Sequence, residues 1–309
     1  MQYTSKDNQD FLNKIPDFET YKNDLDLLRT LNLDSCNDKE IEDAFFKYAK
    51  LLPHFISKIP KDHFNTKTFY RVRNLQHGSE DISLIRTFSY PNPGICNFNG
   101  RANKAGKSVL YTSDYAIAAM IESKQKDEEI GFLGLWQPKV DRDVQFAIFL
   151  PKRIRGNNPW YDDAVQLHEY LSDQTISLGQ NKKAQLDLLN EFVCDQFIYE
   201  KYPYPITSWL CIKMMYGYIG IDFILYPSVE TDSHFCNLAF HPNFAEKYLT
   251  FDKALQFRFE YRKETKVKYS VGRIGKLNMT IIDWKEPTLA EAKIIPGIIE
   301  EGIKKDNGC

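Results

Sequence analysis

Three side chains with chemical potential lie close together in residues 100–122 of the sequence. Arg101 belongs to a loop with two glycines, and its planar guanidinium can bind a phosphate through two parallel hydrogen bonds. Tyr111 lies near the end of a short apolar segment, and Glu122 follows on a short amphipathic segment. A hydrogen-bond donor for a phosphate, an aromatic ring and a fixed carboxylate are the groups that a nucleotide-sugar site needs. The same three residues also suit a surface loop, a core tyrosine and a solvated glutamate.

The local pattern predicts the elements that must position these groups. Residues 108–113 form a short apolar strand, and a helix follows with Asp114 as its N-cap. Earlier in the chain, residues 68–72 predict another strand, with Arg71 inside an apolar run. An arginine at such a position needs a partner or a ligand. The alternatives are therefore a bound anion and a structural salt bridge at a strand edge.

The remaining pattern alternates helical and strand-like segments. Asn37 followed by Glu40 predicts a capping box at the start of an N-terminal helix with one apolar stripe. Other helices are expected at residues 18–31, 161–171, 182–199 and 206–216, and other strands at 131–136, 144–150, 221–226, 237–240, 254–261, 265–271 and 277–283.

Composition excludes several classes of protein. The 309 residues include 43% hydrophobic and 27% charged side chains, with a formal charge of -2. This balance argues against non-specific electrostatic binding to nucleic acid or to an anionic membrane. No apolar run approaches the roughly 20 residues of a membrane span, and the N-terminus lacks the apolar core of a signal peptide. The six cysteines have no CxxC pair, which favours reduced thiols and a cytoplasmic location, and the six histidines lack metal-ligand spacing, which predicts no metal site.

Four stretches in a fixed order resemble a RES-domain protein. They are Phe69-Tyr70-Arg71-Val72, Gly100-Arg101-x-Asn103, residues 111–122, and Tyr226-Pro227-Ser228 followed by Asn237-Leu238-Ala239. The resemblance covers roughly residues 66–252. The chain departs from the family at Ala102, where an aromatic residue is common, and in the long segment at 123–220.

The resemblance implies a fold class and a division of the chain. The RES family is similar in fold to ADP-ribosyltransferases, so we expect an α+β fold with a split or mixed β-sheet core. Residues 66–252 would be the NAD-binding catalytic domain. Residues 1–65 would add a helical N-terminal extension, and residues 253–309 a β-rich C-terminal extension and tail.

The resemblance also implies an activity. Members are toxins of bacterial toxin–antitoxin pairs that degrade NAD by phosphorolysis or hydrolysis of the nicotinamide–ribose bond. NAD would be a substrate rather than a cofactor, with inorganic phosphate as co-substrate in phosphorolysis. The resemblance assigns catalysis to Arg71, Tyr111, Glu122 and Ser228, and NAD binding to Arg71, Arg101, Asn103, Tyr111 and Asn237. The expected partner is a cognate antitoxin, and a homo-oligomer is left open.

Two other functions fit the same residues. The same pocket would serve an ADP-ribosyltransferase whose segment 123–220 recruits a macromolecular target. The chain would otherwise be a non-catalytic nucleotide-binding module that docks through its N-terminal helices. At single positions, Ser228 and Asn237 also suit turns or caps, and Arg101 and Asn103 can simply order their loop.

Overall fold

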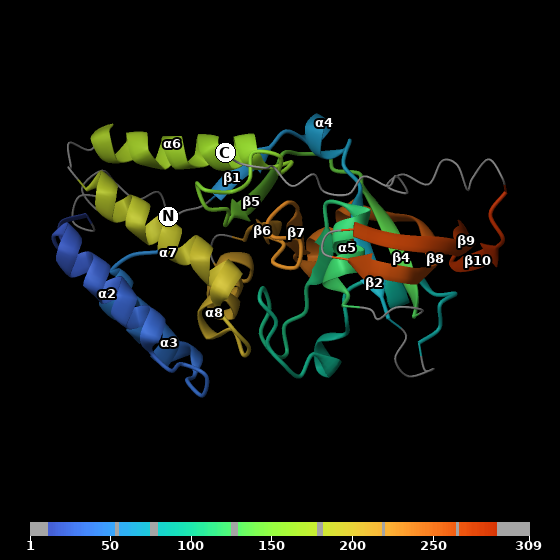
Figure 1. The fold of residues 1–309 in the computed structure, drawn as a ribbon, viewed down its shortest axis with the longest axis horizontal. Coiled ribbons are helices and arrows are strands. Elements are labelled where there is room, and N and C mark those ends of the chain that lie inside the picture. Colours follow the sequence, from blue (N-terminus) through green and yellow to red (C-terminus); the bar gives the residue numbers. More distant parts are fainter. Residues whose placement is uncertain are drawn as a thin grey trace. The chain divides into compact units, whose positions relative to one another are not determined.

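The computed structural model describes residues 12–52, 56–74, 80–124, 129–177, 182–217, 220–263 and 266–288. These residues contain ten strands and eight α-helices. Some neighbouring strands pair in parallel and others antiparallel. Figure 1 shows the arrangement of the elements. The chain is therefore a mixed α+β protein, which confirms the predicted fold class.

The chain divides into two compact units that interleave along the sequence. The first comprises Met1–Ser57, Pro93–Lys107 and Phe146–Tyr226, and the second comprises Lys58–Asn92, Ser108–Gln145 and Pro227–Cys309. The three ranges expected from the sequence follow one another along the chain, and they stay a prediction.

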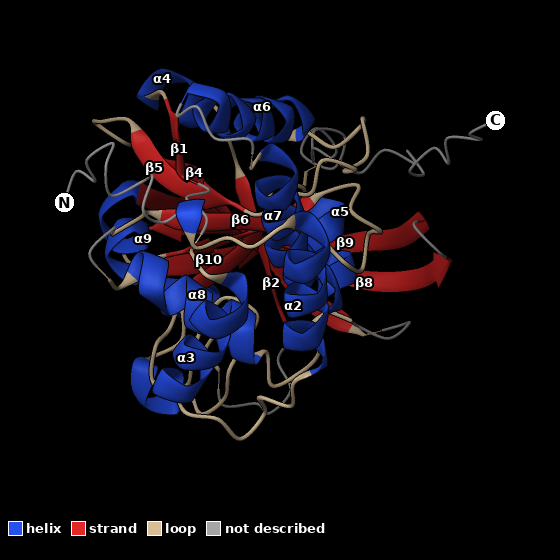
Figure 2. Cartoon of the chain, turned by 90° about the vertical axis from the view of Figure 1, so that its left-hand side faces the viewer, coloured by secondary structure: helices blue, strands red, loops and turns tan. Residues whose placement is uncertain are grey.

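The first unit is mainly helical (Figure 2). Its elements are α2 (Phe18–Thr30), α3 (Asp38–Ala49), the 3₁₀ turn η2 (Pro93–Ile95), β5 (Val144–Ile148), α6 (Tyr161–Ser177), α7 (Lys183–Tyr199), α8 (Pro205–Met215) and β6 (Phe223–Pro227), with β1 (Ile56–Ile59) at the boundary between the units. Helix α3 begins with the predicted capping box, because Asn37 accepts from the Glu40 amide and Glu40 accepts from the Asn37 amide. Strands β5 and β6 pair in parallel, and the rings of Phe146 and Phe223 stack 4.8 Å apart.

The second unit is built on an antiparallel sheet with the strand order β7-β3-β2-β4-β8-β9-β10. Its elements are α4 (Lys61–Phe64), β2 (Phe69–Arg73), the 3₁₀ turn η1 (Ile85–Phe88), β3 (Leu110–Ser113), α5 (Ala116–Glu122), β4 (Ile130–Pro138), β7 (Cys236–Phe240), α9 (Pro242–Tyr248), β8 (Leu249–Lys263), β9 (Lys266–Asn278) and β10 (Ile281–Lys285). The C-terminal strands β8, β9 and β10 extend this sheet directly from β4.

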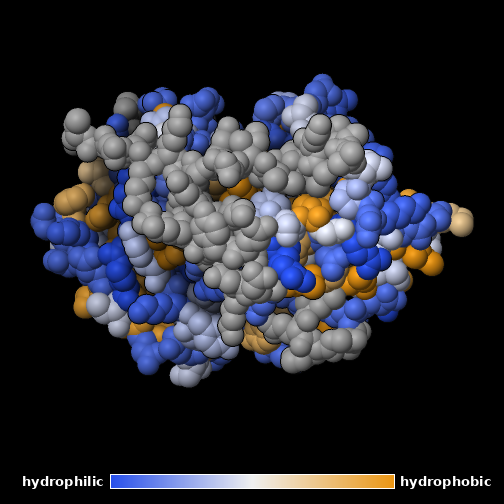
Figure 3. Space-filling view, turned by 45° about the vertical axis from the view of Figure 1, so that its right-hand side comes forward, coloured by the Kyte–Doolittle hydropathy of each residue, from blue (hydrophilic) through white to orange (hydrophobic). Residues whose placement is uncertain are grey.

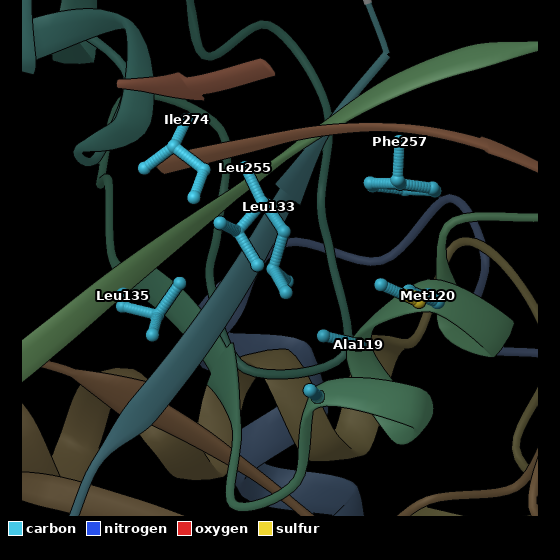
Figure 4. Close-up of a cluster of buried hydrophobic side chains, with 8 residues drawn as sticks. Ala119, Met120, Leu133, Leu135, Leu255, Phe257 and Ile274 are labelled. Atoms are coloured by element: carbon cyan, nitrogen blue, oxygen red, sulfur yellow. The ribbon is translucent and has the colours of Figure 1, made fainter. Parts of the chain in front are cut away.

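Helix α5 is anchored on this sheet by an apolar cluster. Ala119 and Met120 pack against leucines of β4 and against Leu255, Phe257 and Ile274 of β8 and β9 (Figure 4). All residues of α5 before its last are buried. Burying this face stabilises the helix at about 25 cal/mol per Å² of apolar surface. The helix therefore holds its final residue, Glu122, in a fixed place.

Two local predictions are wrong. Tyr115 rather than Asp114 is the N-cap of α5, and Asp114 Oδ1 instead accepts from the Cys236 amide of β7 at 3.1 Å. The expected strand at 277–283 is interrupted, because Met279 has a left-handed φ of 54° and turns the chain from β9 into β10. Both errors arise where tertiary pairing decides between a cap, a strand and a turn.

On the face in Figure 3, hydrophobic residues form separate small areas among hydrophilic ones. Within the described ranges, no helix combines the length and the apolar character needed to cross a bilayer. The five cysteines in these ranges form no disulfide with one another: Cys36, Cys96, Cys194, Cys211 and Cys236.

Candidate functional site

Glu122 is the centre of a hydrogen-bonded group of polar side chains in the second unit. It is half-buried at the last position of α5. Its Oε1 accepts a hydrogen bond of 2.6 Å from Ser228 Oγ and another of 2.8 Å from Asn237 Nδ2. No described residue hydrogen-bonds to the other oxygen, Oε2. The carboxylate is thus fixed through one of its two oxygens.

Asn237 is itself fixed by a residue of the neighbouring strand. Ser113 on β3 lies directly opposite Asn237 on β7, and the hydroxyl of Ser113 donates to Asn237 Oδ1 at 2.7 Å. Both side chains are buried. Because Oδ1 accepts from Ser113, the amide must turn Nδ2 towards Glu122. Ser113 ends the predicted strand and lies in the 111–122 stretch, and its hydroxyl was the available signal for a role in the site.

Ser228 reaches Glu122 from a tight loop that follows β6. The Ser228 amide donates to the Phe235 carbonyl, and the Ser228 carbonyl accepts from the Ser233 amide, each at 2.9 Å. Asp232 and Ser233 adopt left-handed φ angles of 52° and 62° that close the loop. The predicted turn at Ser228 is therefore present, and the same turn aims the hydroxyl at the carboxylate.

Arg71 lies where two strands of the second unit part. Strands β2 and β3 pair only at Tyr70 and Ser113, although a regular antiparallel ladder would continue. Beyond that pair, Arg71 Nη1 donates to the Tyr111 carbonyl at 3.0 Å. The arginine side chain thus replaces a backbone contact at the opening between the strands.

Arg71 is a buried cation without an acidic partner among the described residues. Its Nε is buried and has no hydrogen-bond partner there. Burial, with a smaller effect of nearby Arg73, lowers the pKa of the guanidinium from its ordinary value to about 9, so the group still carries its charge at neutral pH. The expected alternative of a structural salt bridge does not apply to Arg71. It applies to Arg73, which pairs with Glu80.

Tyr111 contributes its backbone to this arrangement. Its carbonyl accepts from Arg71, while its side chain is half-buried. The expected role of Tyr111 in catalysis and NAD binding stays a prediction. No hydrogen bond or ion pair joins Arg71 to Glu122 in the described residues.

Arg101 and Asn103 belong to the first unit. Arg101 Nη1 donates to the carbonyls of Gln196 and Glu200 at 3.5 and 3.3 Å, and its guanidinium lies over the Tyr204 ring, 4.8 Å from the centroid. These carbonyls are at the C-terminal end of α7, where a positive charge is favourable. Asn103 Nδ2 donates within its own loop, to the carbonyls of Phe98 and Lys104.

The structure therefore gathers part of the predicted set. Glu122, Ser228 and Asn237 form one hydrogen-bonded group in the second unit, and Ser113 joins them. Arg71 and Tyr111 form a second contact in that unit. Arg101 and Asn103 order a loop of the first unit, and their role in NAD binding stays a prediction. Two further glutamates follow Glu122 in the sequence: Glu129 is exposed, and Glu128 lies outside the described residues.

Comparison with known proteins leaves the family open. No family model matches the chain, and no curated protein matches it significantly.

Proposed function

We propose that this protein cleaves the nicotinamide–ribose bond of NAD, with phosphate or water as the acceptor. Glu122 would act at the ribose and Arg71 would bind the diphosphate. NAD would be consumed as a substrate, and no resident cofactor is required. In a cytoplasmic setting, we further propose that an antitoxin-like protein partner holds the activity in check.

One observation carries the proposal, namely the way in which Glu122 is held. Ser228 and Asn237 both donate to Oε1, and a well-anchored helix end supports the residue. A solvated helix glutamate would have no reason to be bound by two side chains from distant parts of the sequence. A carboxylate with one fixed oxygen and one available oxygen suits electrostatic catalysis, which depends on preorganised groups.

The chemistry of NAD fits such a group. Breaking the bond between ribose C1′ and the nicotinamide nitrogen develops positive charge on the sugar, and glycosyl-transfer enzymes place carboxylates against this charge. Nicotinamide leaves as a neutral ring, so the bonding electrons neutralise its ring nitrogen and no general acid is needed. Phosphate or water then adds to C1′, and the attacking group loses its proton to solvent or to a nearby base.

Arg71 supplies the complementary requirement. A buried guanidinium with an unpartnered Nε is costly unless an anion balances it. Arginine matches the oxygens of a diphosphate through paired hydrogen bonds. The Tyr111 carbonyl holds one end of the guanidinium, so its orientation is fixed in advance.

The test is to incubate the purified protein with NAD, with and without inorganic phosphate, and to follow nicotinamide release. Release that requires phosphate, with a ribose 1″-phosphate product, indicates phosphorolysis, and release without phosphate indicates hydrolysis. Radiolabelled NAD added to a cell lysate distinguishes transfer, because label would then remain on a macromolecule. If the folded protein consumes no NAD under any of these conditions, the proposed function is wrong.

A further inference from the structure

We infer that Ser113 is a positioning residue that acts on Glu122 through Asn237. The inference rests on the proposed function for its kinetic consequence, while its structural consequence is independent of it. Ser113 lies inside the 111–122 stretch but was not among the residues predicted for the site, and its hydroxyl contacts Asn237 rather than Glu122.

The first step is the polarity of the hydrogen-bond chain. Ser113 Oγ donates to Asn237 Oδ1 at 2.7 Å, and Asn237 Nδ2 donates to Glu122 Oε1 at 2.8 Å. An amide has donors on one side and an acceptor on the other. If the Asn237 amide were rotated by half a turn, its Oδ1 would face Glu122 Oε1, and two acceptors would then oppose each other. Its Nδ2 would face the Ser113 hydroxyl instead.

The second step is burial. Ser113 is 2% exposed and Asn237 is 9% exposed. Without the serine hydroxyl, Asn237 Oδ1 would lose its partner in a place that water reaches poorly, and an unsatisfied buried acceptor is unfavourable. The amide would then shift or turn to find another donor, and its bond to Glu122 would weaken. Ser113 therefore sets the position of a residue that it does not contact.

The third step assigns different tasks to the two oxygens of Glu122. Oε1 accepts from both Ser228 and Asn237, and these two hydrogen bonds fix the plane of the carboxylate. We call the chain of hydrogen bonds from Ser113 through Asn237 to Glu122 the relay. Oε2 is left for the ribose. Loss of the Ser113 hydroxyl should thus change the position of Oε2 relative to the ribose in the transition state. It should affect the binding of NAD less, because binding depends on the diphosphate contacts.

The neighbouring residue provides a matched control. Thr112 Oγ1 is also buried on β3 but has no hydrogen-bond partner among the described residues. Thr112→Val removes this hydroxyl with little change in volume, while Ser113→Ala removes the hydroxyl that belongs to the relay. A general effect of altering β3 would appear in both variants, and an effect of the relay would appear only in Ser113→Ala.

The experiment measures kcat, KM for NAD and Tm of both variants, together with the side-chain amide signal of Asn237 by NMR, assigned with Asn237→Asp. For Ser113→Ala we expect kcat to fall about tenfold, as for the loss of one hydrogen bond, with KM within about twofold. The Asn237 amide signal should shift and exchange faster with solvent. Thr112→Val should leave kcat and the amide signal unchanged.

Each other outcome has a defined meaning. An unchanged Asn237 signal in folded Ser113→Ala overturns the inference, as does an equal fall of kcat in Thr112→Val. An unchanged kcat despite a shifted signal overturns the kinetic role of Ser113. If the parent protein itself consumes no NAD, the proposed function fails, and the NMR comparison still decides whether Ser113 positions Asn237.

Discussion

Ser228 and Glu122 are 106 positions apart in sequence, and Ser228 Oγ donates a 2.6 Å hydrogen bond to Glu122 Oε1. The bond joins the end of α5 to the loop after β6 within the second unit. Ser228 is fully buried, so water competes little for its hydroxyl. The contact therefore brings together two residues that the sequence motifs had suggested only separately.

Ser228→Ala should lower kcat about tenfold to a hundredfold, because a hydrogen bond to a charged group contributes roughly 1.5–3 kcal/mol. Steady-state kinetics with NAD checks this expectation. A suitable control is Thr87→Val, which removes a different buried hydroxyl, one that donates to the Asp81 carbonyl at 2.6 Å. The control should lower Tm and leave kcat unchanged. Similar kinetics in Ser228→Ala and the parent would remove Ser228 from the site.

Arg71→Met should separate stability from binding. A buried charge without an acidic partner carries a desolvation cost that an apolar side chain of similar size does not. We therefore expect Tm to stay level or rise, while KM for NAD increases at least about tenfold through the lost diphosphate contact. Thermal unfolding and kinetics on the same sample test both statements. A large fall in Tm would instead identify Arg71 as a structural residue of the β2–β3 opening.

The effect of Arg71 on stability should not vary with pH in the neutral range. Its pKa is lowered to about 9 in the folded protein, below the ordinary value that the unfolded chain keeps, so both folded and unfolded chains carry the charge well below pH 9. Between these two values the unfolded chain binds the extra proton, and the contribution of Arg71 to the free energy of unfolding rises with pH. The stability difference between the parent and Arg71→Met should therefore be constant around pH 7 in denaturant titrations. A difference that changes steeply there would contradict this account.

Arg101→Ala tests whether the loop arginine has a structural role or a role in NAD binding. Its guanidinium contacts the last carbonyls of α7 and the Tyr204 ring, and loss of these contacts should cost about 1–2 kcal/mol of stability. Arg101→Lys should recover little of this, because an ammonium lacks the planar fork. If KM for NAD rises in both variants while Tm stays at the parent value, the contacts with α7 are unimportant and the predicted phosphate role is correct.

Sequence reasoning located most elements because their periodic patterns agree with their packing. The capping box at Asn37 and the strand around Arg71 need only local information. The N-cap of α5 was predicted wrongly because Asp114 satisfies the Cys236 amide of a strand that is distant in sequence. The residues around Asp114 do not reveal whether its carboxylate caps the helix or accepts from another strand, because the sequence does not show which strand lies beside it.

The candidate site shows the same limit. Ser228, Asn237 and Glu122 were predicted individually. Only the fold shows that Ser228 and Asn237 both donate to the same carboxylate oxygen of Glu122. Ser113 was missed because a serine at the end of a strand is common, and its significance comes from the register that places it opposite Asn237. Arg71 was predicted as an arginine in need of a partner, but the parting of β2 from β3 was not visible in the sequence.

Glu122→Gln is the most direct test of the catalytic group. Glutamine keeps the size of the side chain, and its carbonyl oxygen can still accept from Ser228 and Asn237, but the negative charge is lost. If the carboxylate stabilises the developing cation at the ribose, kcat should fall roughly 10²–10³-fold, the effect of removing one preorganised electrostatic group. KM should change much less, because the contacts of Arg71 with the diphosphate remain.

Two further measurements make the Glu122 test decisive. Tm of Glu122→Gln should stay close to that of the parent, since the helix end loses only a charge that its dipole does not favour. Glu129→Gln, an exposed position at the start of the segment leading into β4, serves as the matched change of charge and should leave kcat unaltered. A kcat of Glu122→Gln within about threefold of the parent, which corresponds to only about 0.65 kcal/mol, would show that Glu122 is not the catalytic carboxylate. A large fall in Glu129→Gln would transfer that role to Glu129.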